Sequence, residues 1–357
     1  MPTLLKPDLP PLLVRADADT SRGTGHVMRC LALAQAWQAR GGSVVFISRC
    51  DSAALRERIQ TAGIDLVLLE HGDTVGAEID TTLSLLAKRD MALLALDGYH
   101  INLEQQQSLR VAGHPLLVID DNAHLDRYHA DILLNQNLGA AQLNYQCNSD
   151  TTLLMGPNYA MLRPEFSLWR RRFRTVRGVA RKILVTLGGS DPNNFTLRVI
   201  HALAQLGAPA LEVRVVVGPA NPHLAPLREA VDSLWLPIQL LTQAPDMAAL
   251  MAWADLAVSA AGTTCWELAC LGLPAVSVVL AENQKRIAEE LDAVEVVQNL
   301  GWHDDVSVDR LATTLDVLLY SSFRRLRMSQ RGRALVDGRG ADRVVQALLE
   351  CSCARAA

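Results

Sequence analysis

Short apolar runs alternate with longer helix-patterned segments along this chain, and no other feature of the sequence restricts the fold as strongly. The run "PLLVRAD" at 11–17 leads into a segment at 26–42 whose apolar residues recur at helical spacing and which ends in two glycines. "SVVFIS" at 43–48 is the next apolar run, and 52–63 is the next helical segment. Continuous apolar strands joined by helices are typical of a parallel sheet covered on both faces. The pattern therefore predicts an α/β fold.

The alternation occurs twice, which predicts two domains. It continues to about residue 160, is interrupted by the basic segment at 163–181, and restarts at 182. A chain of 357 residues is also too long for one ordinary core. We expect Rossmann-like domains at 1–160 and 181–357, joined by a solvated linker helix at 161–180, with the last helices able to pack back toward the first domain. Two doubly wound domains that face each other across a cleft form the GT-B architecture of enzymes acting on nucleotide-activated sugars.

Composition and charge exclude several classes of function. The 34 basic and 38 acidic residues give a net charge of −4, which argues against nucleic acid as a partner. The seven cysteines include no CxxC and no zinc-like spacing, so we expect a reducing cytoplasm and no metal or other cofactor. Prolines interrupt the N-terminal apolar stretch, and no apolar run approaches the roughly 20 residues of a membrane span. The expected protein is cytoplasmic, monomeric and without a membrane partner.

The first strand-to-helix junction, "GTGHVMR" at 23–29, carries a titratable residue. Two glycines leave the junction open, and His26 would begin the helix. Because a helix N-terminus disfavours imidazolium, we expect His26 to be largely neutral near pH 7 and able to accept a proton. The alternative is a histidine that caps the helix and touches only backbone. The other eight histidines share no spacing and mostly resemble surface positions.

Two junctions of the second domain carry glycine and resemble anion sites. "LVTLGGSDPNN" at 184–194 and "LAVSAAGTTCWELACLG" at 256–272 both run from a strand into a helix, and "AENQ" at 281–284 ends the next strand. Small residues let a ligand approach the backbone, and the free N–H groups of a helix start favour an anion. Neither loop is a known nucleotide fingerprint, but together they indicate a nucleotide diphosphate, with Glu267 within reach of a ribose.

Carboxylates end two further strands of the first domain. "LALDGYH" brings Asp97 and Tyr99 to the carboxyl edge of the sheet, where a phenol can bind a sugar hydroxyl or amide. "VIDDNAHLDR" brings Asp120 and Asp121 to the next strand end. Adjacent residues of an extended chain point to opposite faces, so we expect at least one of these two aspartates to be structural. The sequence leaves open whether any of these carboxylates assists catalysis.

About residues 13–285 resemble one protein family, because they carry its motifs in the same order. These motifs are "RADAD…GTGHVMRCLALA", "LDGYH", "VIDD", "YAMLRPEF", "LVTLGGSDPNN", "AAGTTCWELACLGLP" and "LAENQ". The family is that of the UDP-2,4-diacetamido-2,4,6-trideoxy-β-L-altropyranose hydrolases of pseudaminic acid biosynthesis, a nonulosonic acid pathway of flagellin glycosylation. Their second domain is similar to that of the N-acetylglucosaminyltransferase that makes lipid II. Arg22 departs from the apolar residue usual in the family, and 301–357 carries no matching motif.

The resemblance implies metal-independent hydrolysis of a UDP-activated diacetamido-trideoxy sugar, with inversion. It implies that His26 activates water and that the sugar is bound by Arg15, Asp17, Gly25, Tyr99, Asn283 and Gln284. It implies that UDP is held by Gly188, Gly189, Ser190, Ala261, Gly262, Thr263, Thr264 and Glu267. Two alternatives stay open: a GT-B transferase that uses a UDP-amino sugar donor, and a non-catalytic module that binds UDP-sugars.

Overall fold

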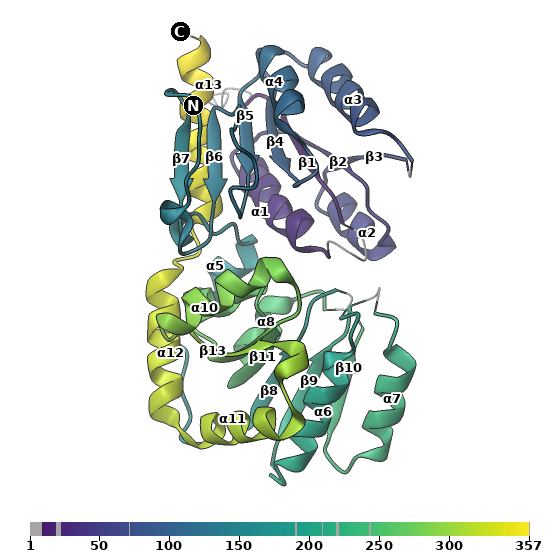
Figure 1. Cartoon of the computed structure of the whole chain (residues 1–357), viewed down its shortest axis with the longest axis vertical. Helices are drawn as coiled ribbons and strands as arrows, with labels where there is room; N and C mark the ends of the chain where they lie inside the picture. The colour runs from purple at the N-terminus through teal and green to yellow at the C-terminus, as the bar shows by residue number, and fades with distance from the viewer. Residues whose placement is uncertain are drawn as a thin grey trace, which may run out of the picture. The chain divides into compact units, whose positions relative to one another are not determined.

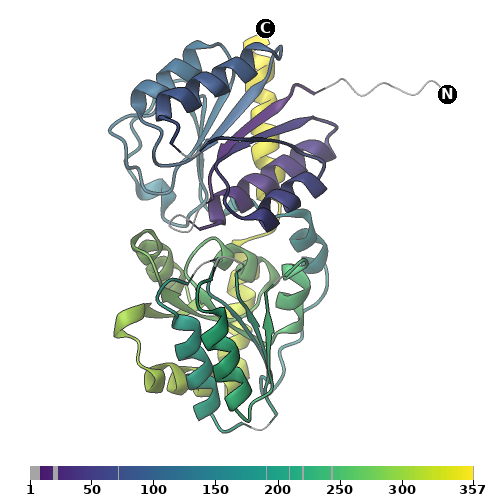
Figure 2. The same cartoon turned by 90° about the vertical axis from the view of Figure 1, so that its right-hand side faces the viewer.

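The structure, a computed structural model, describes residues 9–18, 23–70, 72–189, 191–208, 210–218, 221–242 and 244–356. The chain consists of two compact units (Figures 1 and 2). Unit 1 comprises Met1–Pro164 and Arg339–Ala357, and unit 2 comprises Glu165–Gly338. Arg22 and Ser190, two residues of interest in the sequence, lie outside the described residues.

Unit 1 is built on a seven-stranded parallel sheet of order β3-β2-β1-β4-β5-β6-β7. The apolar runs at 11–17 and 43–48 form its central strands β1 and β2, which are buried at every position. The strands are β1 (Leu12–Ala16), β2 (Val44–Ser48), β3 (Asp65–Leu68), β4 (Leu93–Asp97), β5 (Leu116–Ile119), β6 (Ile132–Asn135) and β7 (Thr152–Met155).

Helices cover both faces of this sheet, which explains why its central strands are apolar on both sides. On one face, side chains of α1, α2 and α13 share a core with Leu12 and Val14. On the other face, α3 and α4 pack on Leu13 and its neighbours. The helices are α1 (Gly25–Ala39), α2 (Ala53–Thr61), α3 (Val75–Ala87), α4 (Leu103–Val111) and α13 (Gly340–Ala356).

Unit 2 repeats the design with a six-stranded parallel sheet of order β10-β9-β8-β11-β12-β13. Helices α6, α7 and α11 pack on one face of the sheet. The strands are β8 (Lys182–Thr186), β9 (Glu212–Val216), β10 (Ile238–Leu241), β11 (Leu256–Ala260), β12 (Ala275–Val279) and β13 (Val297–Trp302). The helices are α5 (Pro164–Arg170), α6 (Phe195–Gln205), α7 (Leu224–Ser233), α8 (Met247–Trp253), α9 (Thr264–Leu271), α10 (Lys285–Ala293), α11 (Val308–Tyr320) and α12 (Ser322–Leu335).

The prediction of two parallel, doubly wound α/β domains is confirmed. Of the basic segment, only Pro164–Arg170 is helical. The Arg174 guanidinium is not solvated there but donates to the carbonyls of Met251, Ala254 and Leu271, where α8 and α9 end.

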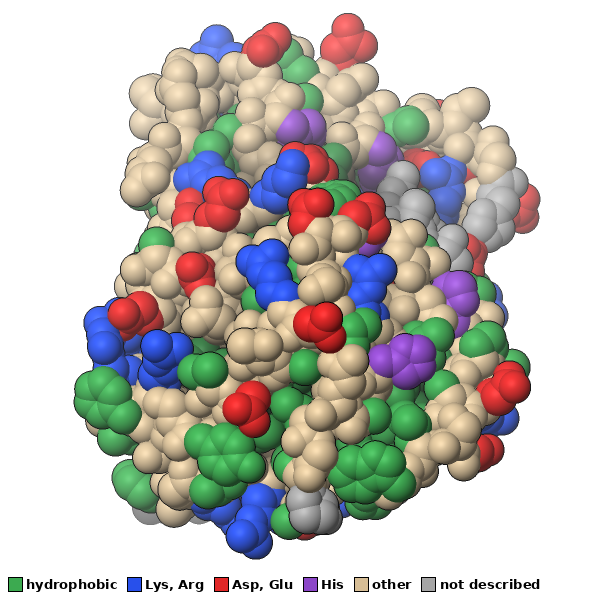
Figure 3. Space-filling view, turned by 60° about the horizontal axis from the view of Figure 1, so that its bottom comes forward, with side chains coloured by type: hydrophobic (Ala, Val, Ile, Leu, Met, Phe, Trp, Pro, Cys, Tyr) green, Lys and Arg blue, Asp and Glu red, His purple; other side chains and the backbone are tan. Residues whose placement is uncertain are grey.

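Basic and acidic side chains are interspersed over the face drawn in Figure 3. Among the described residues, no helix is long and apolar enough to cross a bilayer.

Candidate active site

The strand order of unit 1 changes direction between β1 and β4, so the loops after these two strands diverge from one point of the sheet edge. Ligands of open parallel sheets bind outside the carboxyl ends of the strands at such a point. The loop after β1 leads into α1, whose second residue is His26. Strand β4 ends at Asp97, and Tyr99 follows it. The motifs "GTGHVMR" and "LDGYH" are thereby brought together.

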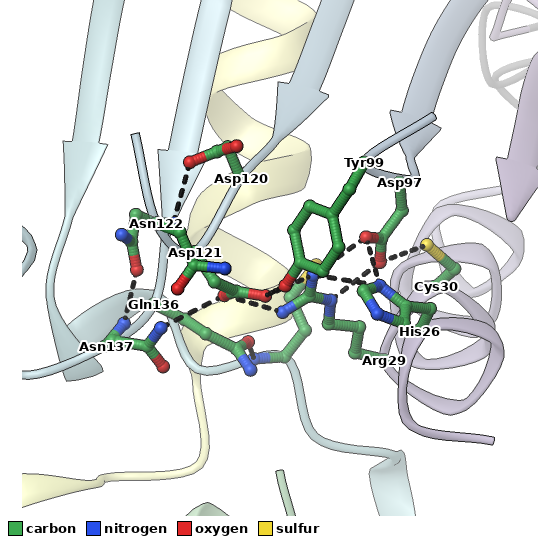
Figure 4. A network of polar contacts seen from close by, with 12 residues as sticks. His26, Arg29, Cys30, Asp97, Tyr99, Asp120, Asp121, Asn122, Gln136 and Asn137 are labelled. Carbon is green, nitrogen blue, oxygen red and sulfur yellow. Dashed lines mark hydrogen bonds and ion pairs between the residues drawn. The ribbon is translucent and has the colours of Figure 1, made fainter. Parts of the chain in front are cut away.

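His26 is oriented by a buried carboxylate. Its Nδ1 lies 2.6 Å from Asp97 Oδ1, and its side chain is 13% exposed (Figure 4). Thr24, the residue that precedes α1, makes no side-chain cap, so His26 is held by Asp97 rather than by the helix start. With Nδ1 donating to the carboxylate, Nε2 carries the lone pair and can accept a proton. Within the described part of the chain, Nε2 has no hydrogen-bond partner.

Asp97 stays ionised because a second cation holds it. Arg29, one helical turn beyond His26, donates from Nε to Asp97 Oδ2 at 2.6 Å and from Nη2 to Oδ1 at 2.7 Å. Burial by itself would raise the pKa of the Asp97 carboxyl, but the Arg29 guanidinium and His26 hold it well below its usual range. A permanent negative charge beside Nδ1 keeps the ring proton on that nitrogen and fixes the orientation of the ring.

Arg29 also connects this pair to Tyr99 through Asp121. Its Nη1 donates to Asp121 Oδ1 at 2.9 Å, and the Tyr99 hydroxyl donates to Asp121 Oδ2 at 2.6 Å. Burial and the charge of Asp121 raise the pKa of the Tyr99 phenol, so it keeps its proton. Because that proton points at Asp121, the phenol oxygen is left to accept a hydrogen bond from a ligand.

The two adjacent aspartates after β5 have different surroundings. Asp120 is fully buried, and its Oδ1 accepts from the backbone N–H groups of Asn122 and Ala123 at 2.8 and 2.6 Å and from the Tyr145 hydroxyl at 2.9 Å. It shapes the turn that follows the strand. Asp121 faces Arg29 and Tyr99 instead. Opposite directions of neighbouring side chains are what an extended backbone dictates.

A cavity of about 290 Å³ opens at this strand edge, lined by Asp17, His26, Asp97, Gly98, Tyr99 and His100. Its volume lies near the lower end of small-molecule sites, roughly 300 Å³, so it holds a small ligand or one part of a larger one. A Cβ at Gly98 would lie 2.8 Å from Cε1 of His100, so residue 98 has no room for a side chain while His100 keeps its place.

His100, which lines the cavity, is held by a buried ionic cluster. Its Nε2 lies 3.3 Å from Arg15 Nη2 and 3.4 Å from Glu78 Oε2. Arg15, 2% exposed, also donates to Asp17 at 2.9 Å and to Glu78 at 2.6 Å. Against the opposing effect of burial, His100 and Arg15 lower the pKa of the Glu78 carboxyl to about 2. With its guanidinium paired in this way, Arg15 is placed to orient Asp17 and His100.

Sequence reasoning missed Arg29, Glu78 and His100 as parts of this site. His100 was grouped with the surface histidines, yet its side chain is only 17% exposed and lines the cavity. His303 is likewise buried. Arg29 carried a usable signal, since it follows His26 by three positions and both residues lie on one face of a helix. Glu78 carried none, because it comes from α3, far along the chain.

In unit 2, the switch point lies between β8 and β11, and both predicted glycine loops follow these strands. Gly188 has φ +92°, a conformation that a side chain would strain. A Cβ at Gly218 would lie 2.0 Å from the Gly189 carbonyl oxygen, so the loop after β9 packs tightly on this one. Asp191 closes the loop, because its carboxylate accepts from the backbone N–H groups of Phe195 and Thr196 at 2.9 and 2.8 Å.

The loop after β11 leads into α9 and lies beside Gln284. Ala261 is buried, whereas Gly262, Thr263 and Thr264 are partly exposed, and Thr263 makes no side-chain cap. A Cβ at Gly262 would lie 3.8 Å from Gln284 Nε2, so these two predicted residues are neighbours. Glu267 lies in the first turn of α9, and Asn283 is exposed on the short helix Glu282–Gln284. The predicted sugar-binding residues thus come from both units.

Comparison with known proteins supports the fold. Residues 183–336 match the family described as "Glycosyltransferase family 28 C-terminal domain". Over 93% of its length the chain is 27% identical to the spore coat polysaccharide biosynthesis protein SpsG of Bacillus subtilis, of which 96% is covered. Over 49% of its length it is 35% identical to a UDP-N-acetylglucosamine–N-acetylmuramyl-(pentapeptide) pyrophosphoryl-undecaprenol N-acetylglucosamine transferase of Xanthomonas campestris, of which it spans 41%.

Among solved structures, MurG of Acinetobacter baumannii is similar to this chain, with a TM-score of 0.64 at 18% identity over 96% of the chain and all of MurG. The likeness assigns the GT-B fold to this chain. The match at 183–336 contains both glycine loops of unit 2 and the short helix with Asn283 and Gln284.

Proposed function

We propose that this chain hydrolyses a UDP-linked amino sugar at its anomeric carbon, with His26 as the general base. The finer proposal follows the motifs of the first domain: the substrate is UDP-2,4-diacetamido-2,4,6-trideoxy-β-L-altropyranose, and the products are UDP and the free sugar with inverted configuration. The observation that carries the proposal is the His26–Asp97 pair. One ring nitrogen lies on an ionised carboxylate, and the other lies beside a cavity and has no partner among the residues that the structure describes.

In the proposed reaction, Nε2 of His26 takes a proton from water as the water oxygen bonds to the anomeric carbon. The bond from that carbon to the phosphate oxygen breaks, and its electron pair leaves with UDP. Asp97 keeps Nδ1 protonated and stabilises the imidazolium that forms. Arg15 and Arg29 are each paired with carboxylates, which suits this cavity to a sugar that develops positive charge rather than to phosphates.

UDP is proposed to bind at the switch point of unit 2. There the loop after β11 leads into the start of α9, where Thr263 makes no side-chain cap. The start of α6 is capped by the Asp191 carboxylate, so the loop after β8 is proposed to contribute through the backbone of Gly188 and Gly189. A helix start stabilises a nearby anion by about 0.3–2 kcal/mol, and direct N–H hydrogen bonds add to this. Because UDP leaves as a stabilised anion, the reaction does not require a separate general acid.

Glycosyl transfer is the second candidate, and the match of residues 183–336 to a glycosyltransferase domain favours it. The same base would then deprotonate an acceptor hydroxyl instead of water. The two reactions differ in whether UDP is released when no acceptor is present.

The test incubates the purified chain with a panel of UDP-sugars, with and without sugar and lipid acceptors, and measures UDP and free sugar. Hydrolysis predicts equal amounts of both products without an acceptor, and His26→Gln should lower the rate roughly 10²–10⁴-fold while UDP still binds. His114→Gln is the matched control, because that histidine bonds only the Ala92 carbonyl. UDP release only with an acceptor would replace hydrolysis by transfer, and binding without any turnover would leave a binding module.

A further inference from the structure

Two segments of unit 2, residues 168–182 and 317–335, carry charge and apolar surface that the proposed reaction does not use. Together they hold twelve of the chain's 34 basic residues and none of its 38 acidic residues. They also hold seven of the thirteen large hydrophobic side chains that are exposed in the described part of the chain, among them Leu168, Phe173, Tyr320 and Phe323. Positive charge and exposed apolar surface are therefore concentrated in the same small part of a chain whose net charge is negative.

The two segments lie side by side. Arg325, which is buried in α12, donates from Nη2 to the Gly178 carbonyl at 3.1 Å. Further along α12, Arg170 and Arg333 each donate to the backbone carbonyl of the other, at 2.7 and 2.9 Å. The first segment thus runs along α12, a helix at the edge of unit 2 (Figure 1). We call the surface of these two segments the basic strip.

The fold uses only some of the arginines of the basic strip. Arg170, Arg174, Arg325 and Arg333 bond to backbone carbonyls, and two others, Arg327 and Arg331, pair with Glu295. Arg177 lies 3.7 Å from Asp255 but is 54% exposed. Four more form no ion pair with any residue that the structure describes and are exposed, namely Arg171, Arg172, Arg181 and Arg324. Internal bonding does not explain these five exposed charges.

The apolar side chains of the basic strip project from it. Phe173 is 92% exposed and Phe323 is 67% exposed. Aromatic rings and guanidiniums are also in contact here, since Arg327 lies over the Phe323 ring at 5.7 Å and Arg172 lies over the Trp169 ring at 4.0 Å. A projecting ring gains most from a partner that deforms around it and has an apolar layer beneath its charges. The interface of a lipid bilayer has both properties, and aromatic and basic side chains are enriched there.

We propose that the basic strip binds the surface of an anionic bilayer, with the exposed arginines at the lipid phosphates and Phe173 and Phe323 inserted among the headgroups. Such binding needs no membrane-spanning helix. It would replace the sequence-based expectation of a chain without a membrane partner, and it does not depend on the proposed reaction. A basic residue near an anionic leaflet strengthens binding roughly fivefold, and salt weakens this attraction.

The test is co-sedimentation of the full chain with vesicles of phosphatidylcholine alone or with about 30% phosphatidylglycerol. Binding should require the anionic lipid and should weaken at least tenfold when salt rises from about 50 to 500 mM. Equal binding to both kinds of vesicle, or no binding to the anionic vesicles at low salt, overturns the proposal. Binding of a short DNA duplex without binding to vesicles would also overturn it, because the strip would then be a nucleic-acid site.

Variants locate the binding surface, and all of them change exposed side chains, so urea denaturation should show wild-type stability. The triple change Arg171→Gln, Arg172→Gln and Arg324→Gln should weaken binding on the order of 100-fold, and the pair Phe173→Ser and Phe323→Ser about tenfold. The matched controls Arg228→Gln and Trp235→Ser change an exposed arginine and an exposed ring outside the strip and should have no effect. Binding that either set of strip changes leaves intact, or that the controls reduce equally, contradicts the proposal.

Discussion

Replacing Asp97 with asparagine removes the negative charge from the carboxylate that holds both His26 and Arg29, while keeping the shape of the side chain. Asp97 Oδ1 accepts from His26 Nδ1 and Arg29 Nη2, and Oδ2 accepts from Arg29 Nε. Asparagine offers one oxygen and one NH2 group, so an N–H must point at one of these donors. If it points at His26, Nδ1 must become the acceptor, and the ring proton moves to Nε2.

That tautomer cannot take a proton from water, so we expect kcat for UDP release to fall roughly 10²–10⁴-fold in Asp97→Asn. Arg29 would keep Asp121 as a charged partner but lose the charge of residue 97. Breaking a buried ion pair costs about 3–5 kcal/mol of unfolding free energy. Urea denaturation measures the second effect, and the ¹⁵N shifts of the His26 ring report the tautomer directly.

Asp131→Asn is the matched control for stability. Asp131 is a buried carboxylate of the same unit that pairs with Arg110 and Arg355 rather than with the residues around His26. It should lose stability without losing turnover. A Asp97→Asn protein that is destabilised but keeps kcat within about threefold of the wild type, with an unchanged His26 tautomer, would refute the catalytic argument.

Three further changes have defined outcomes. Tyr99→Phe removes the hydrogen bond to Asp121 and should raise KM for the UDP-sugar about 5–10-fold, from the loss of about 1–1.5 kcal/mol, with UDP affinity unchanged in calorimetry. Gly218→Ala places a Cβ 2.0 Å from the Gly189 carbonyl oxygen, so it should displace that loop and weaken UDP binding in the same calorimetric assay. Glu78, with its pKa lowered from 4.5 to about 2, stabilises the fold above its unfolded pKa and loses this effect as pH falls through about 2. Glu78→Gln should therefore show a shallower fall of unfolding free energy between these two pH values in denaturant titrations.

The fold follows from the sequence because its signal is local. Strands such as Val44–Ser48 are apolar at four successive positions, from Val44 to Ile47, and only a sheet covered on both faces requires that. The alternation also predicts that "GTGHVMR" and "LDGYH" both lie at the carboxyl edge of one parallel sheet, because each motif follows a strand.

The hydrogen bonds and ion pairs that connect the site residues do not follow from the sequence, because they depend on which distant segments become neighbours. Arg29 meets Asp97 and Asp121 only after β1, β4 and β5 are placed side by side. Glu78 reaches Arg15 from α3, which packs on the face of the sheet opposite to α1. Likewise, the pattern of residues 340–352 predicts a helix, but only packing on α1 assigns that helix to unit 1.

The most direct test of the account is the fate of water oxygen during turnover. The chain is incubated with the hydrolysed UDP-sugar in ¹⁸O-water without an acceptor, quenched within minutes, and both products are weighed by mass spectrometry. Attack on the anomeric carbon with His26 as base predicts ¹⁸O in the free sugar and none in UDP. Label in the β-phosphate of UDP would contradict it, because water would then have attacked phosphorus.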